Sequence, residues 1–233
     1  MIETYNESHL HRTLKILYAE QSGGLMEQEV EGKICDIVAE SGEIIEIQTG
    51  NIGKLAGKIA RLVQNHKVRL VYPLVTEKYI ETLDEKGALL SKRKSPQKAV
   101  IYSIFRELTG IYPWLLHENF LLEALEVTVT EKRIRTPKPI QLANKSRRFL
   151  RNWYKSDKEL RSAGNTWIFA GAASYTALLP FEPGKEFSVR DLANAGAGKN
   201  ASLMIWVLVK AGIITFREKR GKSNYYVLPA IGE

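Results

Sequence analysis

The stretch KICDIVAESGEIIEIQTG, residues 33–50, decides the fold of the first part of the chain. Two short apolar runs flank a turn that contains Gly42, and this pattern predicts a β-hairpin. Asp36 interrupts the first run, and Glu46 and Gln48 interrupt the second. Pairing through the turn would bring Asp36 beside Glu46. Because neighbouring carboxylates disfavour each other's ionisation unless a cation lies between them, the hairpin predicts a cation site.

The second run has side chains on both faces of its strand. Successive residues alternate, so Glu46 and Gln48 share one face while Ile45 and Ile47 share the other. Ile44 lies on the face of Glu46, which indicates a strand covered on both sides. Carboxylate oxygens suit Mg²⁺ or Mn²⁺, and these ions can activate water for phosphodiester hydrolysis.

The hairpin lies within a longer series of short elements. Asn6 is a candidate N-cap, and Gly23-Gly24 ends the first helical stripe. In order, the predicted elements are a helix over 6–19, strands over 25–31, 33–39 and 43–48, a helix over 52–63 and a strand over 68–72.

This order resembles the PD-(D/E)XK nuclease superfamily, which includes restriction endonucleases and Holliday-junction resolvases. Asp36 matches the acid of the second core strand, and Glu46-Ile47-Gln48 matches the (D/E)-x-K triplet of the third. Glu7 matches a further acid that many members carry in their first helix. The resemblance covers roughly residues 5–75. It implies a restriction-endonuclease-like mixed sheet flanked by helices, with Asp36, Glu46 and Glu7 holding Mg²⁺ or Mn²⁺.

The sequence departs from the family where a lysine is expected. Gln48 stands there, and glutamine can neither carry a positive charge nor act in proton transfer. Lys54 and Lys58, one turn apart at the start of the next helix, are the first candidates to replace it, with Lys33 and Arg69 behind them. In the implied mechanism Gln48 orients water, and Lys54 or Lys58 stabilises developing charge.

Simpler explanations of these residues stay open. Asp36 also suits an edge-strand charge. Glu46 and Gln48 also suit a solvated face, and Glu7 suits a first-turn acid favoured by the helix dipole. His11 lies one turn from Glu7 and could orient it. Cys35, the single cysteine, lies in an apolar run and is interpreted as a buried structural residue.

The net charge of +8 is unevenly distributed. Residues 138–233 hold 16 Lys/Arg against 7 Asp/Glu, whereas residues 1–137 hold 18 against 19. Such an excess favours a polyanion partner, nucleic acid before membrane. No apolar run approaches the length of a membrane span and no secretory leader is evident, so a cytoplasmic protein is expected.

After residue 72 the pattern predicts mostly helices. Thr136-Pro-Lys-Pro139 predicts a linker, because prolines disfavour both helix and central strand. The predicted elements are helices at about 76–84, 98–109, 140–154 and 166–178, a strand within 121–135 and a basic loop over 91–96. The basic residues around the helix predicted over 140–154 either extend the row of contacts to phosphates or pack their aliphatic stems against the first domain. They are Lys145, Arg147, Arg148, Arg151 and Lys155.

Residues 187–228 have a clearer pattern. Ser188 caps a short helix, a second helix ends at Gly212, and two β-prone runs over 213–216 and 225–228 enclose a basic tip. This arrangement resembles the winged-helix fold of DNA-binding proteins, whose second helix enters the major groove. The residues expected to face the groove are Lys199, Asn200 and Ser202, and those expected on the wing are Arg217, Lys219, Arg220 and Lys222. A protein-interaction module is the alternative for this unit.

The predicted organisation is a PD-(D/E)XK nuclease-like domain over 1–137, a basic helical linker over 138–164 and a winged-helix domain over 165–233. The expected protein is a metal-dependent deoxyribonuclease that binds double-stranded DNA, as a monomer or homodimer. The alternative is a winged-helix transcriptional regulator whose inactive nuclease-like domain serves dimerisation or ligand sensing.

Overall fold

The structure is a computed structural model that describes residues 8–141 and 150–229. Its first elements confirm the predicted order of helix, three strands, helix and strand. They are α1 (His9–Ser22), β1 (Leu25–Val30), β2 (Lys33–Val38), β3 (Ile44–Ile47), η1 (Ile52–Leu55), α2 (Ala56–Leu62) and β4 (Val68–Leu83).

The first helix begins at His9, three residues later than the sequence pattern predicts. Ser8 caps it, because the Ser8 hydroxyl accepts a hydrogen bond from the backbone N–H of His11 at 3.3 Å. Gly23 ends it in the left-handed conformation, as a C-terminal glycine commonly does. The predicted cap Asn6 lies outside the described residues.

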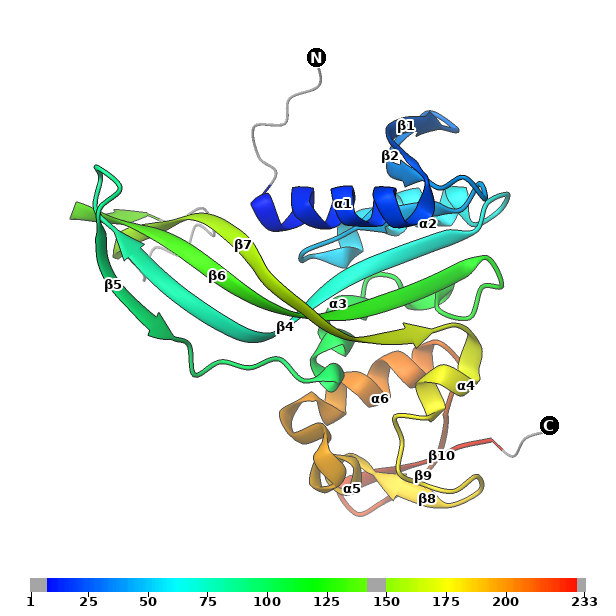
Figure 1. The fold of residues 1–233 in the computed structure, drawn as a ribbon. Coiled ribbons are helices and arrows are strands. Elements are labelled where there is room, and N and C mark those ends of the chain that lie inside the picture. Colours follow the sequence, from blue (N-terminus) through cyan, green and yellow to red (C-terminus); the bar gives the residue numbers. More distant parts are fainter. Residues whose placement is uncertain (1–7, 142–149, 230–233) are drawn as a thin grey trace.

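A large mixed sheet forms the centre of the protein, with helices on both faces (Figure 1). Its strand order is β1-β2-β3-β4-β6-β7, and β5 (Leu89–Lys94) pairs with β4. The parallel pairs are β3–β4 and β4–β6, while β6 (Phe120–Gln141) and β7 (Leu150–Phe169) are antiparallel. The chain is therefore a mixed α/β protein.

The two faces of the sheet bury separate clusters of apolar side chains. α1 covers one face, where Leu10 and Leu14 pack with Ile45 and Ile47. Ile44 faces the other cluster, together with residues of α2, α3 (Phe105–Leu108) and the C-terminal helices. All four residues of β3 are buried, which confirms the prediction of a strand covered on both faces.

Several predicted helices are strands instead. Residues 76–83 belong to β4, where the pairing with β6 shifts register at Thr76 and continues over residues 77–83, and residues 150–169 form β7 on the other side of β6. The basic loop predicted over 91–96 is β5 as far as Lys94. Inter-strand hydrogen bonds along β6 satisfy the backbone of these segments and outweigh their weak helical patterns.

The predicted linker is also part of a strand. Thr136–Pro139 lies within β6, and pairing with β7 skips from Arg135 to Ile140 at this point. Because proline has no N–H to donate, an interruption of the ladder is where a strand tolerates it. The helical linker predicted over 138–164 is therefore strand wherever it is described, with residues 138–141 in β6 and 150–164 in β7. Lys145, Arg147 and Arg148 lie outside the described residues.

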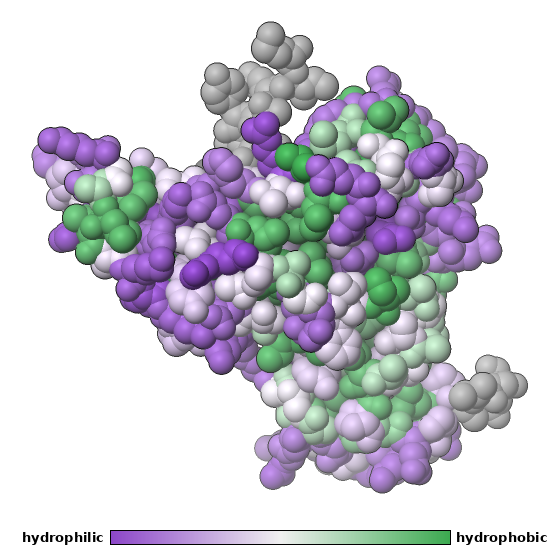
Figure 2. All heavy atoms as spheres, viewed as in Figure 1, coloured by the Kyte–Doolittle hydropathy of each residue, from purple (hydrophilic) through white to green (hydrophobic). Residues whose placement is uncertain are grey.

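The distal parts of β4, β6 and β7, together with β5, form a protruding arm (Figure 1). The arm comprises residues 76–94, 129–141 and 150–161, and it holds 13 Lys/Arg against 7 Asp/Glu. Figure 2 shows a mostly hydrophilic arm surface with an apolar patch near the tip. Much of the basic excess of the chain is thus gathered on one projection.

The C-terminal unit is built from short helices and a three-stranded sheet of order β8-β10-β9. Ser188 and Asp191 form a capping box at the start of α5, which confirms the predicted cap. The helix predicted over 166–178 begins only at Gly171, because the preceding residues belong to β7. The elements are α4 (Gly171–Thr176), β8 (Glu186–Ser188), α5 (Val189–Leu192), α6 (Ala201–Lys210), β9 (Thr215–Arg220) and β10 (Ser223–Val227).

α6 packs against the first part of the chain. Met204, Ile205 and Leu208 share one buried cluster with Phe105 of α3. The rings of Tyr112 and Trp206 meet edge to face at 5.4 Å between centroids. No helix within the described residues is long and apolar enough to cross a membrane.

The backbone of Gly53 in η1 closely approaches that of Gly110, which follows α3, and substitution can test this contact. A Cβ on Gly110 would lie 2.6 Å from the Gly53 Cα, so we expect Gly110→Ala to lower the free energy of unfolding by about 1–3 kcal/mol. Gly57→Ala is the matched control, because a Cβ there meets nothing within 4 Å and α2 gains about 0.5–1 kcal/mol. Urea unfolding of both variants measures the effects. Equal changes in the free energy of unfolding would contradict the close contact between Gly53 and Gly110.

Candidate active site

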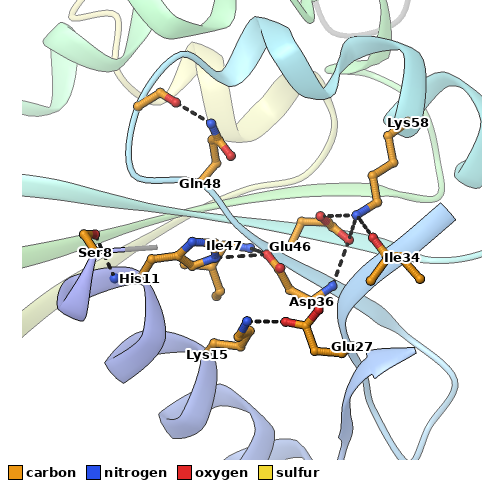
Figure 3. A network of polar contacts seen from close by, with 11 residues as sticks. Ser8, His11, Lys15, Glu27, Ile34, Asp36, Glu46, Ile47, Gln48 and Lys58 are labelled. Carbon is orange, nitrogen blue, oxygen red and sulfur yellow. Dashed lines mark hydrogen bonds and ion pairs between the residues drawn. The ribbon is translucent and has the colours of Figure 1, made fainter. Parts of the chain in front are cut away.

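Asp36 and Glu46 meet where β2 and β3 separate. The paired register ends at Ile37 and Ile45, one residue before the two acids. Beyond it, the backbone N–H of Ile47 donates to Asp36 Oδ2 at 2.9 Å, and the N–H of Asp36 donates to Glu46 Oε1 at 3.3 Å (Figure 3). The two carboxylates thus accept backbone donors at the point where the strand ladder stops.

Lys58 provides the positive charge beside Glu46. The Glu46 side chain is 3% exposed, and Lys58 Nζ lies 2.6 Å from each of its carboxylate oxygens. The same ammonium group donates to the backbone carbonyl of Ile34 at 2.5 Å. Lys58 therefore links α2 to both strands of the hairpin, and the sequence-based choice of Lys58 agrees with this position.

His11 contacts the other acid of the pair. Its Nε2 atom lies 3.3 Å from Asp36 Oδ2, so α1 contributes an imidazole on the side opposite to Lys58 (Figure 3). The sequence analysis assigned His11 to Glu7, which lies outside the described residues. The contact with Asp36 joins residues 25 positions apart and had no local signal.

The two carboxyl groups are shifted in opposite directions. Burial raises the pKa of Asp36, but the hydrogen bonds from His11 and Ile47 outweigh it and hold that pKa below its usual range. Burial and the negative charge of Asp36 raise the pKa of Glu46, and Lys58 offsets only part of this effect. A buried pair with opposed shifts is characteristic of catalytic carboxylates, although ionic networks also produce them.

The other residues predicted for this site lie apart from the carboxylates. The Gln48 amide donates to the backbone carbonyls of Gly50 and Asn51 and so points into the following loop (Figure 3). Lys54 and Lys33 are exposed. Arg69 lies on the opposite face of the sheet and forms ion pairs with Glu43 and Glu123.

The chemistry of the acid pair fits a divalent cation. Two carboxylates lie side by side, and the charge of Asp36 disfavours ionisation of Glu46. A hard cation between their oxygens would relieve this repulsion. Among the described residues no third His, Cys, Asp or Glu completes a metal-binding group with them. The predicted third ligand, Glu7, lies outside the described residues.

A second group of possible metal ligands joins α1 to β7. His9, Asp157 and Glu159 offer ligand atoms within 4.8 Å of one another. His9 Nδ1 lies 2.5 Å from Asp157 Oδ2, and Lys132 holds Glu159 at 2.6 Å. No short motif in the sequence predicts this group, because His9 and Asp157 are 148 positions apart.

The basic residues predicted for DNA contact divide into two sets. Lys199 and Asn200 line a cleft between the C-terminal unit and the main sheet, whereas Ser202 is exposed on α6. On the β9–β10 hairpin, Arg217 and Arg220 form ion pairs with Glu186, and Arg220 also contacts Glu218. Lys219 and Lys222 are exposed and form no ion pair with any described residue.

The buried ion pair predicts a specific pattern of stability. Lys58→Met leaves the Glu46 carboxylate buried without a cation, so we expect a loss of about 3 kcal/mol in the free energy of unfolding. The double variant Lys58→Met/Glu46→Gln should lose less, because no charge is left unpaired. Lys54→Met is the control and should change stability by no more than about 0.5 kcal/mol. If the losses of free energy caused by Lys58→Met and by Glu46→Gln simply add in the double variant, as urea unfolding measures them, the ion pair is contradicted.

The raised pKa of Glu46 predicts how stability depends on pH. Between the ordinary value of 4.5 and the raised value, the folded chain binds more protons at this carboxyl than the unfolded chain does. The free energy of unfolding should therefore fall as pH rises through that window. Relative to Glu46→Gln, the unaltered protein should lose stability from pH 4.5 upward, as urea unfolding measures at each pH. A difference that stays flat would show that Glu46 titrates normally.

Comparisons with known proteins identify relatives of the whole chain. Residues 8–170 match a family described as "Domain of unknown function (DUF8091)", and the match ends where β7 meets α4. An uncharacterized protein of Treponema pallidum (strain Nichols) is 32% identical over 232 residues, which cover 97% of this chain and 86% of the relative. No solved structure matches the chain. The chain belongs to the DUF8091 family.

Proposed function

We propose that this protein is a metal-dependent nuclease that hydrolyses phosphodiester bonds in double-stranded DNA. The observation that carries the proposal is the convergence of Asp36, Glu46 and Lys58 on one buried point of the sheet. The PD-(D/E)XK superfamily uses two acids and a lysine in this way. The observed order of elements, and a lysine supplied by α2 in place of Gln48, support assignment of residues 8–75 to that superfamily.

Each residue has a chemical role in this proposal. Asp36 and Glu46 would hold Mg²⁺ or Mn²⁺, which when bound supplies an activated water and neutralises charge on the phosphate. His11 and the Ile47 N–H keep Asp36 ionised and oriented for binding. The Lys58 ammonium is placed to stabilise negative charge that develops on the phosphate oxygens. Gln48 takes no part, because its amide is engaged with the loop.

The rest of the chain offers surfaces for the nucleic acid. The arm carries a net basic charge, which attracts a phosphate backbone independently of sequence. The order α4-β8-α5-α6-β9-β10, with a sheet in the order β8-β10-β9, supports a winged-helix assignment for residues 171–228. In that unit the exposed candidates for contact with DNA are Lys199, Ser202, Arg217, Lys219, Arg220 and Lys222.

A second function is favoured by one observation. Lys58 contacts both oxygens of Glu46, and His11 contacts Asp36, so the two carboxylates already have positively charged or hydrogen-bonding neighbours. Such a network satisfies both carboxylates without a metal, so it need not mark a catalytic site. The protein would then be a DNA-binding regulator whose first domain serves dimerisation or ligand sensing.

Cutting assays separate the two functions. We expect the protein to convert supercoiled plasmid and a labelled linear duplex to shorter products only with Mg²⁺ or Mn²⁺. Asp36→Asn and Glu46→Gln should abolish cutting, because each removes one carboxylate of the pair, and Lys58→Met should slow it about 100-fold or more. Gel electrophoresis measures all three.

Glu40→Gln is the matched control, because Glu40 is an exposed acid of the same hairpin. It should cut like the unaltered protein. Metal-dependent cutting that survives in both Asp36→Asn and Glu46→Gln would locate the chemistry elsewhere or in a contaminant. If the DNA migrates more slowly in the gel because protein binds it, but neither the unaltered protein nor any variant cuts it, the regulator is favoured.

A further inference from the structure

A basic cleft lies at the junction of the arm, the segment 97–107 and the start of α6. It has a volume of about 550 Å³, within the range of about 300–1,000 Å³ typical of small-molecule sites. Six of the residues that line it are cationic, and two are acidic, Glu107 and Glu131. The cations are Lys78, Lys98, Arg106, Lys155, Lys158 and Lys199.

The acids of the cleft are already engaged. Lys78 and Arg133 contact Glu131 at 3.4 and 2.5 Å, and Glu107 accepts a hydrogen bond from the backbone N–H of Ile52 at 3.3 Å. The other five cations of the cleft form no ion pair with an acid in residues 8–141 or 150–229. The cleft therefore gathers more positive than negative charge.

Lys158 has unfavourable electrostatic surroundings. It stands opposite Glu131 in the register of β6 and β7, but Lys78 and Arg133 hold that acid. Burial and the neighbouring charge of Lys155 lower the pKa of Lys158 to about 8. An anion in the cleft would stabilise the charged form of this lysine and remove the repulsion.

From this geometry we infer that the cleft is a binding site for the phosphate groups of a ligand. Lysine and arginine from four separate segments of the chain can surround an anion, and Ser103, Gln97 and Asn200 add neutral polar groups to the lining. The phosphates belong either to a compound of nucleotide size or to a nucleic-acid backbone that enters the cleft.

The cleft adjoins the loop that follows the candidate active site. The N–H of Gln48 donates to the carbonyl of Val71 at 2.9 Å, and the next residue, Tyr72, lines the cleft. Glu107 joins the cleft wall to Ile52 at the end of the same loop. Binding of phosphate here does not require hydrolysis at Asp36 and Glu46, so the two proposals can fail separately.

Calorimetric titration with inorganic pyrophosphate, in low salt with EDTA and no divalent metal, tests the site. We expect Lys158→Gln to weaken pyrophosphate binding about tenfold or more, because a charge-assisted contact is lost. Lys185→Gln removes the same charge from an exposed lysine of the C-terminal unit and should leave the affinity unchanged. Urea unfolding should show both variants folded, since Lys158→Gln removes a charge that burial disfavours.

A fluorescent oligonucleotide, single-stranded or duplex, distinguishes the two sources of phosphate. If the ligand is nucleic acid, Lys158→Gln should reduce the slope of log affinity against log salt by about 0.7–0.9. If the ligand is a compound of nucleotide size, Lys158→Gln should weaken the binding of pyrophosphate but not that of the oligonucleotide. Either of these two results supports the site. Unchanged binding of both probes by Lys158→Gln, or an equal loss in Lys185→Gln, would overturn it.

Discussion

The structure depends on one buried charge. Glu46 lies in a strand whose four residues are all buried, and its carboxylate is 3% exposed. A charge in such a position must be paired or protonated. Lys58 supplies the partner from α2, and the same ammonium group contacts the backbone of β2. This single ion pair therefore fixes the position of a helix relative to two strands and defines the candidate site.

The ion pair does not restore the pKa of Glu46 to its usual value. Lys58 offsets only part of the effects that raise the pKa of Glu46, and Asp36 lies close enough to oppose ionisation of its neighbour. Asp36 itself stays ionised because His11 and a backbone N–H stabilise its negative charge. An arrangement that served stability alone would gain from apolar residues at these positions. Retention of two acids there is consistent with a functional requirement.

Charge is organised by distance from this site. The acids and Lys58 lie within the body of the sheet, while the arm and the cleft at its base have more cationic than acidic residues. β6 makes this possible, because it pairs with β4 and β7 over nearly its whole length and carries their basic residues away from the core.

The sequence alone determined the order of elements over about the first 72 residues and the position of the acid pair. The hairpin of residues 33–50 is specified by local alternation and a Gly-containing turn, so Asp36 and Glu46 could be placed side by side without coordinates. Lys58 was among the candidates because helical spacing brought it near the hairpin. Only the tertiary structure decided that residues 76–83 and 150–169 are strands, since pairing with β6 overrides their local patterns. It also assembled the cleft, whose lining residues range from Tyr72 to Leu203, because no periodicity within a segment records which distant segments will meet.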